Sequence, residues 1–265
     1  MITISPAVNH TSYPIDPDTT PQHVETAEAQ TVVRNKRGVA NHSRLWPQNK
    51  TITISFMDVA GKDKEIFKEA IGSISPYVNL QFKFVDGNDG EIRIATEKNE
   101  GDWSELGVAA LYGPPDEATL NVDTHGFDDN KIRSKILHEF GHALGLEHEH
   151  QHPDRSFSLN IPDVYRTFGA GGASTAVIAS NIIAPLNPAD VTTSDYDQKS
   201  VMHYPFLASS TSNNVAIPAN DELSQGDKDF LASLYPPPRK VKRKWPSAEE
   251  LVAYRIFSKQ AQQHE

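Results

Sequence analysis

The sequence predicts an α+β fold, with a twisted mixed sheet and two helices in its first part and an irregular second part that ends in a closing helix. Apolar and polar residues alternate in TITISF (51–56), LQFKFV (80–85) and EIRIAT (91–96), a two-residue period that is typical of strands. Apolar residues recur at helical spacing in residues 63–75 and again in residues 128–145. The two periods together predict a sheet covered by helices.

The connections between the predicted strands are short and contain turn residues. DGNDG (86–90) follows the second strand, and its acidic residues resemble the start of a calcium-binding loop. The calcium pattern requires glycine at its sixth position, where this chain has Glu91. We therefore predict a β-hairpin turn at this point. VAAL (108–111) and TLNVD (119–123) are predicted to form two further short strands.

The segment 128–145 is the strongest helix prediction in the chain. Two aspartates suit its N-terminus, and Gly145 suits its C-terminus. After it, NIPDVYRTF (160–168) predicts a short helix, and residues 169–200, rich in Gly, Ala, Ser and Asn, predict mainly loop. GDKDFLASLY (226–235) predicts the closing helix, which three prolines end.

The chain divides into three predicted parts. Residues 1–43 have little hydrophobic periodicity and are expected to be a flexible arm or a pro-segment. Within this arm, RNKRG (34–38) is either a processing site for a basic-specific protease or a solvated charge cluster. Residues 44–238 are expected to form the folded domain, and residues 239–265 a basic linker followed by a C-terminal helix.

Composition excludes several classes of function. The net charge of −10 argues against nucleic-acid binding, which requires a basic face. The chain has no cysteine, which excludes disulfides and thiolate metal sites. No apolar run approaches the roughly 20 residues that span a bilayer, and the first residues lack the pattern of an ordinary signal peptide. We expect a monomer that does not contact membranes.

The stretch HEFGHALGLEHEH (138–150) predicts a metal site. His138 and His142 are four residues apart on a helix, so both imidazoles project from one face. Gly145 allows the chain to turn sharply, and His148 can then supply a third nitrogen. Three protein ligands with an open fourth position are typical of a single catalytic Zn²⁺ ion.

Glu139 follows the first of these histidines and is the candidate general base. From this position a carboxylate can take a proton from zinc-activated water and later deliver it to the leaving amine. This chemistry predicts a zinc-dependent metalloendopeptidase that hydrolyses peptide bonds without a covalent intermediate. Its partners are therefore expected to be protein or peptide substrates.

The pattern His138-Glu139-x-x-His142-x-x-Gly145-x-x-His148 resembles the metzincin signature, and SVMHY (200–204) resembles the methionine turn of that group. This turn resembles that of astacin-like proteases of bacterial or fungal type without disulfides. Four other segments share the resemblance: HEHQHPDR, YDQKSVMHY, LSQGDKDFLASLY and RLWP. The resemblance covers about residues 44–236. It implies a metzincin catalytic domain in residues 44–238.

The resemblance also assigns roles to individual residues. Met202 would form the apolar floor beneath the three imidazoles, and Tyr204 would stabilise the tetrahedral intermediate as a movable fifth ligand. Glu149 matches the acid that holds a new N-terminus in astacins, or else is solvated. Substrate would lie extended along an edge strand near GVAALYG (107–113). Secretion is implied by the family, although no signal peptide is visible.

Three alternatives stay open at this point. A matrixin-like protease shares HEFGHALGLEH, and Tyr204→Phe separates it from the astacin type, in which the change lowers turnover several-fold. A zinc-retaining pseudo-protease could act as a protein-binding module, but it has no need of Glu139. An inhibitor or structural protein with an accidental motif would lack the paired methionine turn. Three further histidines (His150, His152 and His203) are expected to be solvated or hydrogen-bonded rather than metal ligands.

Overall fold

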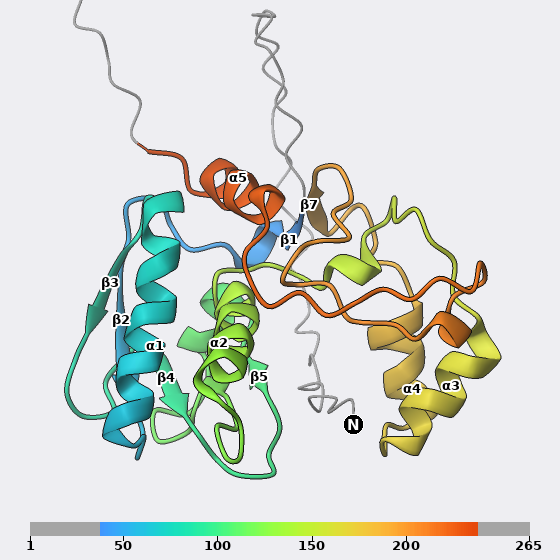
Figure 1. The fold of residues 1–265 in the computed structure, drawn as a ribbon. Coiled ribbons are helices and arrows are strands. Elements are labelled where there is room, and N and C mark those ends of the chain that lie inside the picture. Colours follow the sequence, from blue (N-terminus) through green and yellow to red (C-terminus); the bar gives the residue numbers. More distant parts are fainter. Residues whose placement is uncertain (1–37, 238–265) are drawn as a thin grey trace, which may run out of the picture.

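The computed structural model describes residues 38–237, which fold as an α+β domain (Figure 1). The strands are β1 (Val39–Asn41), β2 (Thr51–Phe56), β3 (Gln81–Phe84), β4 (Ile92–Ala95), β5 (Trp103–Ser104), β6 (Leu120–Asn121) and β7 (Val191–Thr193). The α-helices are α1 (Gly61–Ile74), α2 (Asp129–Ala143), α3 (Ile161–Ala170), α4 (Thr175–Ile178) and α5 (Gln225–Leu234). Short 3₁₀ or π turns complete the elements: η1 (His42–Arg44), η2 (Ser75–Tyr77), η3 (Gly107–Leu111), η4 (Glu149–Gln151), η5 (Ala179–Ile183) and η6 (Ala208–Ser210).

The main sheet is mixed, as predicted, with the strand order β3-β2-β4-β6-β5. Strands β2, β3, β4 and β6 run parallel, and β5 pairs antiparallel with β6 at one edge. Helices α1 and α2 lie side by side against this sheet (Figure 1). Phe67 of α1 packs edge-on against Phe56 of β2, and Phe140 of α2 does the same against Phe82 of β3. Aromatic residues thus fill the space between the helices and the sheet.

The predicted hairpin at residues 86–90 is wrong. β3 and β4 lie on opposite sides of β2, and both run parallel to it. β3 pairs with β2 up to Ile54, and β4 begins its pairing there, so the chain crosses β2 at this level without reversing direction. Gly90 lies against Ser55 of β2, and its amide donates to the Ser55 hydroxyl at 3.1 Å. A side chain at Gly90 would collide with β2, which makes glycine necessary for this crossing.

Other parts of the chain also differ from the predictions. VAAL (108–111) lies in the 3₁₀ turn η3 rather than in a strand. Residues 169–200 contain α4, the π turn η5 and β7 in addition to loop. β1, expected within the flexible arm, pairs with β7, and its residue Ala40 is fully buried. The predicted C-terminal helix lies outside the described residues.

The second half of the domain has its own apolar cluster. Val164 and Phe168 of α3 pack with Ile178 of α4, Ile182 and Phe206. Figure 1 shows α3 and α4 at the opposite end of the domain from β3. The predicted closing helix is confirmed as α5, which begins with a capping box between Ser224 and Asp227. Among residues 38–237, no helix combines the length and the apolar character that crossing a membrane requires.

Candidate active site

Three histidines converge at the C-terminal end of α2. His138 and His142 lie on consecutive turns of this helix and therefore share one face. Gly145 follows the helix with a φ of +90°, a conformation that side chains disfavour. The chain then returns so that His148 faces the other two rings, and one ring nitrogen from each histidine lies within 4.8 Å of the others.

Backbone carbonyls fix the orientation of two of the rings. Nδ1 of His138 lies 2.8 Å from the carbonyl oxygen of Val201, and Nδ1 of His142 lies 2.8 Å from that of Leu146. Because a carbonyl only accepts, each Nδ1 carries the proton and each Nε2 presents a lone pair. Nε2 of His142 is 3.1 Å from Nε2 of His148. Zn²⁺ prefers imidazole nitrogens that converge on one point, in rings whose other nitrogen is hydrogen-bonded. The three histidines converge in this way, and the Nδ1 atoms of His138 and His142 are hydrogen-bonded, so these residues fit the ion.

Glu139 lies beside this nitrogen cluster and is almost fully buried, with 4% of its surface exposed. Burial raises the pKa of its carboxyl well above the usual value, the charge of Asp102 raises it further, and Lys135 opposes both. A dication at the three histidines would also lower this pKa, because positive charge stabilises the carboxylate. Burial shields the carboxyl from bulk solvent.

Tyr204 forms one wall of the site. Its ring centroid is 4.4 Å from that of His148 and 5.8 Å from that of His138. The ring also stacks on His150, with centroids 4.6 Å apart and planes 24° apart. Burial, followed by the charge of Glu139, raises the pKa of the phenol, so the hydroxyl keeps its proton and can donate.

The predicted methionine turn lies beneath the histidines. Met202 is buried, and its sulfur packs against Gly141 of α2 so closely that a side chain at residue 141 would collide with it. Asp227 of α5 fixes the turn by accepting from the Ser200 hydroxyl at 2.6 Å and from the Val201 amide at 2.9 Å. The same Val201 carbonyl orients His138, so α5 contributes to the geometry of the metal site.

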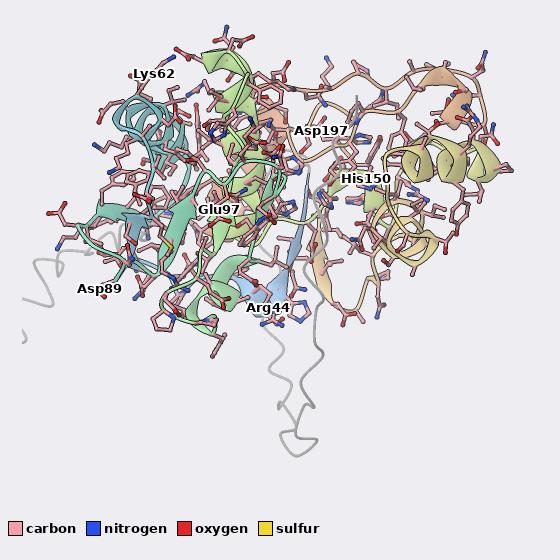
Figure 2. All side chains as sticks on the ribbon, turned by 90° about the horizontal axis from the view of Figure 1, so that it is seen from below. Arg44, Lys62, Asp89, Glu97, His150 and Asp197 are labelled. Atoms are coloured by element: carbon pink, nitrogen blue, oxygen red, sulfur yellow. The ribbon has the colours of Figure 1, made fainter. Side chains whose placement is uncertain are left out.

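The three additional histidines do not join the nitrogen cluster. His150 and His152 are fully buried, and each has Nε2 near a backbone carbonyl, that of Asn181 at 3.0 Å and that of Ser194 at 2.8 Å. His203 lies between the Tyr204 carbonyl and the Tyr196 hydroxyl, both at 2.7 Å. Figure 2 shows His150 in the half of the domain that contains α3, away from Glu97 and Lys62 in the sheet half. The expectation that these histidines are hydrogen-bonded is confirmed, but they are buried rather than solvated.

Glu149 is not solvated either. It is 1% exposed and accepts a hydrogen bond of 2.6 Å from the amide of Asp197. Burial raises its pKa to about 9, and the nearby carboxylates of Asp227 and Asp197 add to this shift. The buried Glu149 carboxyl therefore lies near the carboxylates of Asp197 and Asp227, an environment that favours a positively charged partner.

Two residues of the site region are not evident from the sequence. Lys135 and Asp102 form an ion pair whose charges both act on Glu139. Lys135 lies four residues before Glu139, so helical periodicity alone could have placed it on the same face. Asp102 comes from a distant loop and carries no local signal, because only the sheet topology brings it to α2.

The comparisons with known proteins agree with this geometry. The family model described as Astacin, a family of peptidases, matches residues 38–228, well over half of the chain. The solved structure of myroilysin superposes with a TM-score of 0.73 at 31% identity, covering 76% of this chain and 99% of that one.

Curated relatives match over parts of their length. The dorsal-ventral patterning protein tolloid of Drosophila melanogaster is 26% identical over 79% of this chain, which spans 19% of tolloid. The astacin-like metalloprotease toxin 2 of Loxosceles intermedia is 29% identical over 51% of this chain, which spans 48% of the toxin.

The resemblance to astacins is thus confirmed by a match that includes the three histidines, Glu139 and the methionine turn. The chain belongs to the astacin family of peptidases, and residues 38–228 are a metalloendopeptidase domain with the metzincin fold.

Proposed function

We propose that the chain is a zinc-dependent metalloendopeptidase in which His138, His142 and His148 hold one catalytic Zn²⁺. The observation that carries this proposal is the convergence of three imidazole nitrogens beside the buried Glu139. When bound there, zinc lowers the pKa of a water molecule to about 7 and polarises the scissile carbonyl. The orientation of His138 and His142 by backbone carbonyls supports a preformed site.

Glu139 is proposed as the general base. Its carboxylate takes a proton from the attacking water, retains it in a pocket shielded from solvent, and delivers it to the nitrogen of the leaving amine. Burial supports this role, since it shields the carboxyl from bulk solvent. No covalent bond forms between Glu139 and the substrate.

Tyr204 is proposed to stabilise the oxyanion of the tetrahedral intermediate. Its hydroxyl keeps its proton and donates a hydrogen bond to the oxygen that gains negative charge. The ring is supported by stacking on His150, which keeps the phenol next to His148. This role distinguishes the proposed mechanism from that of a matrixin-like protease.

Substrate is proposed to lie extended along β5 rather than along residues 107–113. Those residues form a 3₁₀ turn, whereas β5 is the last strand of the main sheet and pairs on one side with β6. Its other side can add main-chain hydrogen bonds to a peptide. The contact between α2 and β5 supports a substrate path next to the histidines.

Residues 1–37 are proposed to be a pro-segment whose removal after Arg37 leaves Gly38 as a new N-terminus. Gly38 precedes β1, and the carboxyls of Glu149, Asp197 and Asp227 together favour an ammonium group. An extracellular site of action is proposed as well, because a relative is named a toxin.

The test compares the wild-type chain with Glu139→Ala in cleavage of casein and of a quenched peptide, with the zinc content of both proteins measured. We expect the wild type to cleave and the variant to lose activity, while both contain about one zinc per chain. If both contain zinc and neither cleaves after trimming at Arg37, the chain is a zinc-bearing binding module instead.

A further inference from the structure

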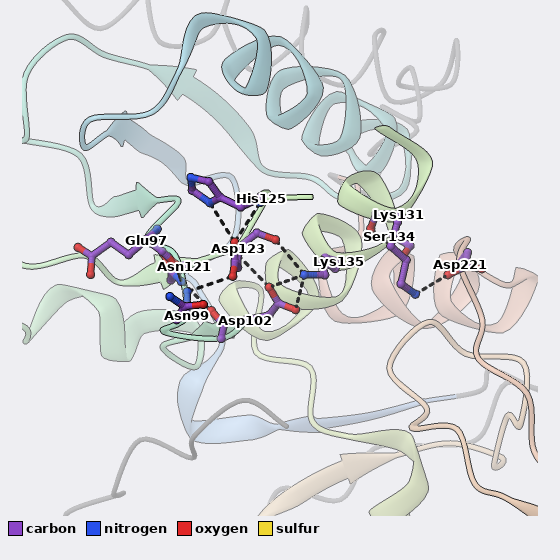
Figure 3. A network of polar contacts seen from close by, with 11 residues as sticks. Glu97, Asn99, Asp102, Asn121, Asp123, His125, Lys131, Ser134, Lys135 and Asp221 are labelled. Carbon is purple, nitrogen blue, oxygen red and sulfur yellow. Dashed lines mark hydrogen bonds and ion pairs between the residues drawn. The ribbon is translucent and has the colours of Figure 1, made fainter. Parts of the chain in front are cut away.

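An ion pair outside the histidine cluster connects α2 with the edge of the sheet (Figure 3). Nζ of Lys135 lies 3.2 and 3.1 Å from the two carboxylate oxygens of Asp102 and donates to the Asp123 carbonyl at 2.8 Å. The ammonium also lies 3.6 Å from the centre of the Phe127 ring. The side chains of Lys135 and Asp102 are only 11% and 16% exposed. Such shielding strengthens a charge pair relative to one at the surface.

Lys135 and Asp102 lie where they connect the helix of Glu139 to the edge of the sheet. Lys135 lies one helical turn before Glu139 on α2. Asp102 is the residue directly before β5, and its carboxylate also accepts from the Asp123 amide at 2.9 Å. Asp123 follows β6 closely, so one carboxylate joins the helix, the edge strand and its neighbouring strand.

β5 has few other constraints. It contains two residues, Trp103 and Ser104, which pair with Asn121 and Leu120 of β6. No strand pairs with its outer side among residues 38–237. A strand this short is not fixed by its own ladder of hydrogen bonds, and its distance from α2 therefore depends on side-chain contacts.

We propose that Lys135 and Asp102 are positioning residues, which hold β5, and with it the main chain of an extended peptide substrate, at a fixed distance from Glu139. This inference rests on the proposed function, because it assigns the pair a role in substrate binding. Neither side chain is assigned a contact with the reacting atoms.

The charges of the pair are balanced at the site. Burial is the main reason for the raised pKa of Glu139, and the charge of Asp102 adds to it while that of Lys135 opposes it. The pKa of Tyr204 is raised mainly by burial, next by the charge of Glu139, and least by the charge of Asp102. Pairing lets a carboxylate lie close to the catalytic groups while its charge is compensated by a neighbouring ammonium.

The chain offers a matched control on the same helix. Lys131 lies one turn before Lys135 and pairs with Asp221 at 3.2 Å (Figure 3). This second pair is exposed, at 45% and 60%, and Asp221 belongs to the loop before α5 rather than to the sheet edge. Lys131→Met and Lys135→Met thus remove the same charge from one helix, but only the second frees the edge strand.

The experiment measures steady-state kinetics of both variants on a long quenched peptide and on a truncated peptide that ends next to the scissile bond. For Lys135→Met we expect KM of the long peptide to rise about tenfold, equivalent to about 1.4 kcal/mol. We expect KM of the truncated peptide and the zinc content to stay near wild-type values. Because the charge of Lys135 acts on Glu139, kcat should change by the same factor on both peptides. Lys135→Arg, which keeps the charge, should restore most of the binding, and Lys131→Met should leave KM of both peptides unchanged.

Hydrogen exchange provides a readout that does not depend on activity. Amides of residues 103–105 should exchange faster in Lys135→Met than in the wild type and Lys131→Met, while those of α1 stay unchanged. An equal rise of KM on both peptides with a lower melting temperature would assign the pair a purely structural role and overturn the proposal, as would unchanged KM and exchange. If the wild type, trimmed at Arg37, cleaves neither peptide, the proposed function fails, and exchange alone decides whether the pair holds β5. If Lys135→Met does not fold, Asp102→Asn carries the same readouts, since its amide oxygen can still accept from Asp123.

Discussion

At the scale of single residues, the histidines between residues 138 and 152 differ in which ring nitrogen contacts a backbone carbonyl. His138 and His142, two of the three proposed zinc ligands, use Nδ1 for this contact. His150 and His152 use Nε2, and their rings stay outside the cluster. The tautomer that each carbonyl imposes thus distinguishes the proposed ligands His138 and His142 from His150 and His152 within one fifteen-residue stretch, 138–152.

Tyr204→Phe tests the role of the phenol at this scale. The ring and its stacking on His150 are retained, and only the hydroxyl is lost. We expect kcat to fall several-fold, because a hydrogen-bond donor to the oxyanion is lost, with unchanged zinc content. Tyr77→Phe, in the turn η2 away from the histidines, is the control. A variant with full kcat would favour the matrixin-like mechanism.

At the scale of elements, the turn after α2 determines where His148 lies. Gly145 adopts a φ of +90°, and a Cβ there would lie 2.9 Å from a methyl carbon of Leu45. The sharp turn is required because His142 and His148 are six residues apart and their Nε2 atoms are 3.1 Å apart. A normal helical C-terminus would carry the chain away from the first two ligands.

Gly145→Ala should therefore weaken both the fold and the metal site. Strain in the left-handed region costs about 1–2 kcal/mol, and displacement of His148 lowers zinc affinity. Gly72→Ala is the matched control, because Gly72 lies in α1 with open space around it and should gain roughly 0.5–1 kcal/mol from the same substitution. Denaturant unfolding and competition with a zinc chelator measure the two effects. Equal behaviour of the two variants would contradict the argument.

Elements with strong periodicity were predictable from the sequence, and connections between strands were not. α2 combines a capping aspartate, an apolar stripe and a terminal glycine, so every local signal agrees. DGNDG (86–90) has the residues of a hairpin turn. Its conformation is instead determined by the pairing of β3 and β4 on opposite sides of β2, which is a long-range contact. VAAL (108–111) is a short apolar run, which fits a strand or a buried turn equally well.

The same division holds for the site. His138, Glu139, His142 and His148 are fixed by spacing within one helix and one turn, so the sequence alone brings them together. Asp102 reaches the site through the sheet, and no local pattern marks it. Asp227 has capping-box spacing with Ser224, but this spacing does not reveal its contact with Val201. These contacts could not be predicted from the sequence, because they depend on how distant parts of the chain pack together.

At the scale of the whole molecule, buried neutral histidines make the fold sensitive to acid. Burial lowers the pKa of His138, His148, His150, His152 and His203. The unfolded chain can protonate all of them near pH 6.5, whereas the folded chain resists. Protons therefore favour the unfolded state as the pH falls, and the free energy of unfolding decreases.

His203 provides the measurable case. Burial lowers its pKa to about 4, so between pH 6.5 and about 4 the unfolded state binds one more proton at this residue than the folded state. Stability rises with pH across this window and is lost as the pH falls through it. In His203→Gln, urea unfolding should lose about 1.4 kcal/mol per pH unit of this slope. An unchanged slope would show that His203 is protonated in the folded protein.

The central claim is that the domain is a peptidase built around one zinc held by three histidines. Stepwise addition of Zn²⁺ to the metal-depleted chain, trimmed at Arg37, tests it most directly, with cleavage of a quenched peptide followed at each step. The account predicts that activity rises linearly and reaches its plateau at one zinc per chain, and that His148→Ala fails to reach it. Full cleavage by the metal-depleted chain, or a plateau that His148→Ala shares, would contradict the account.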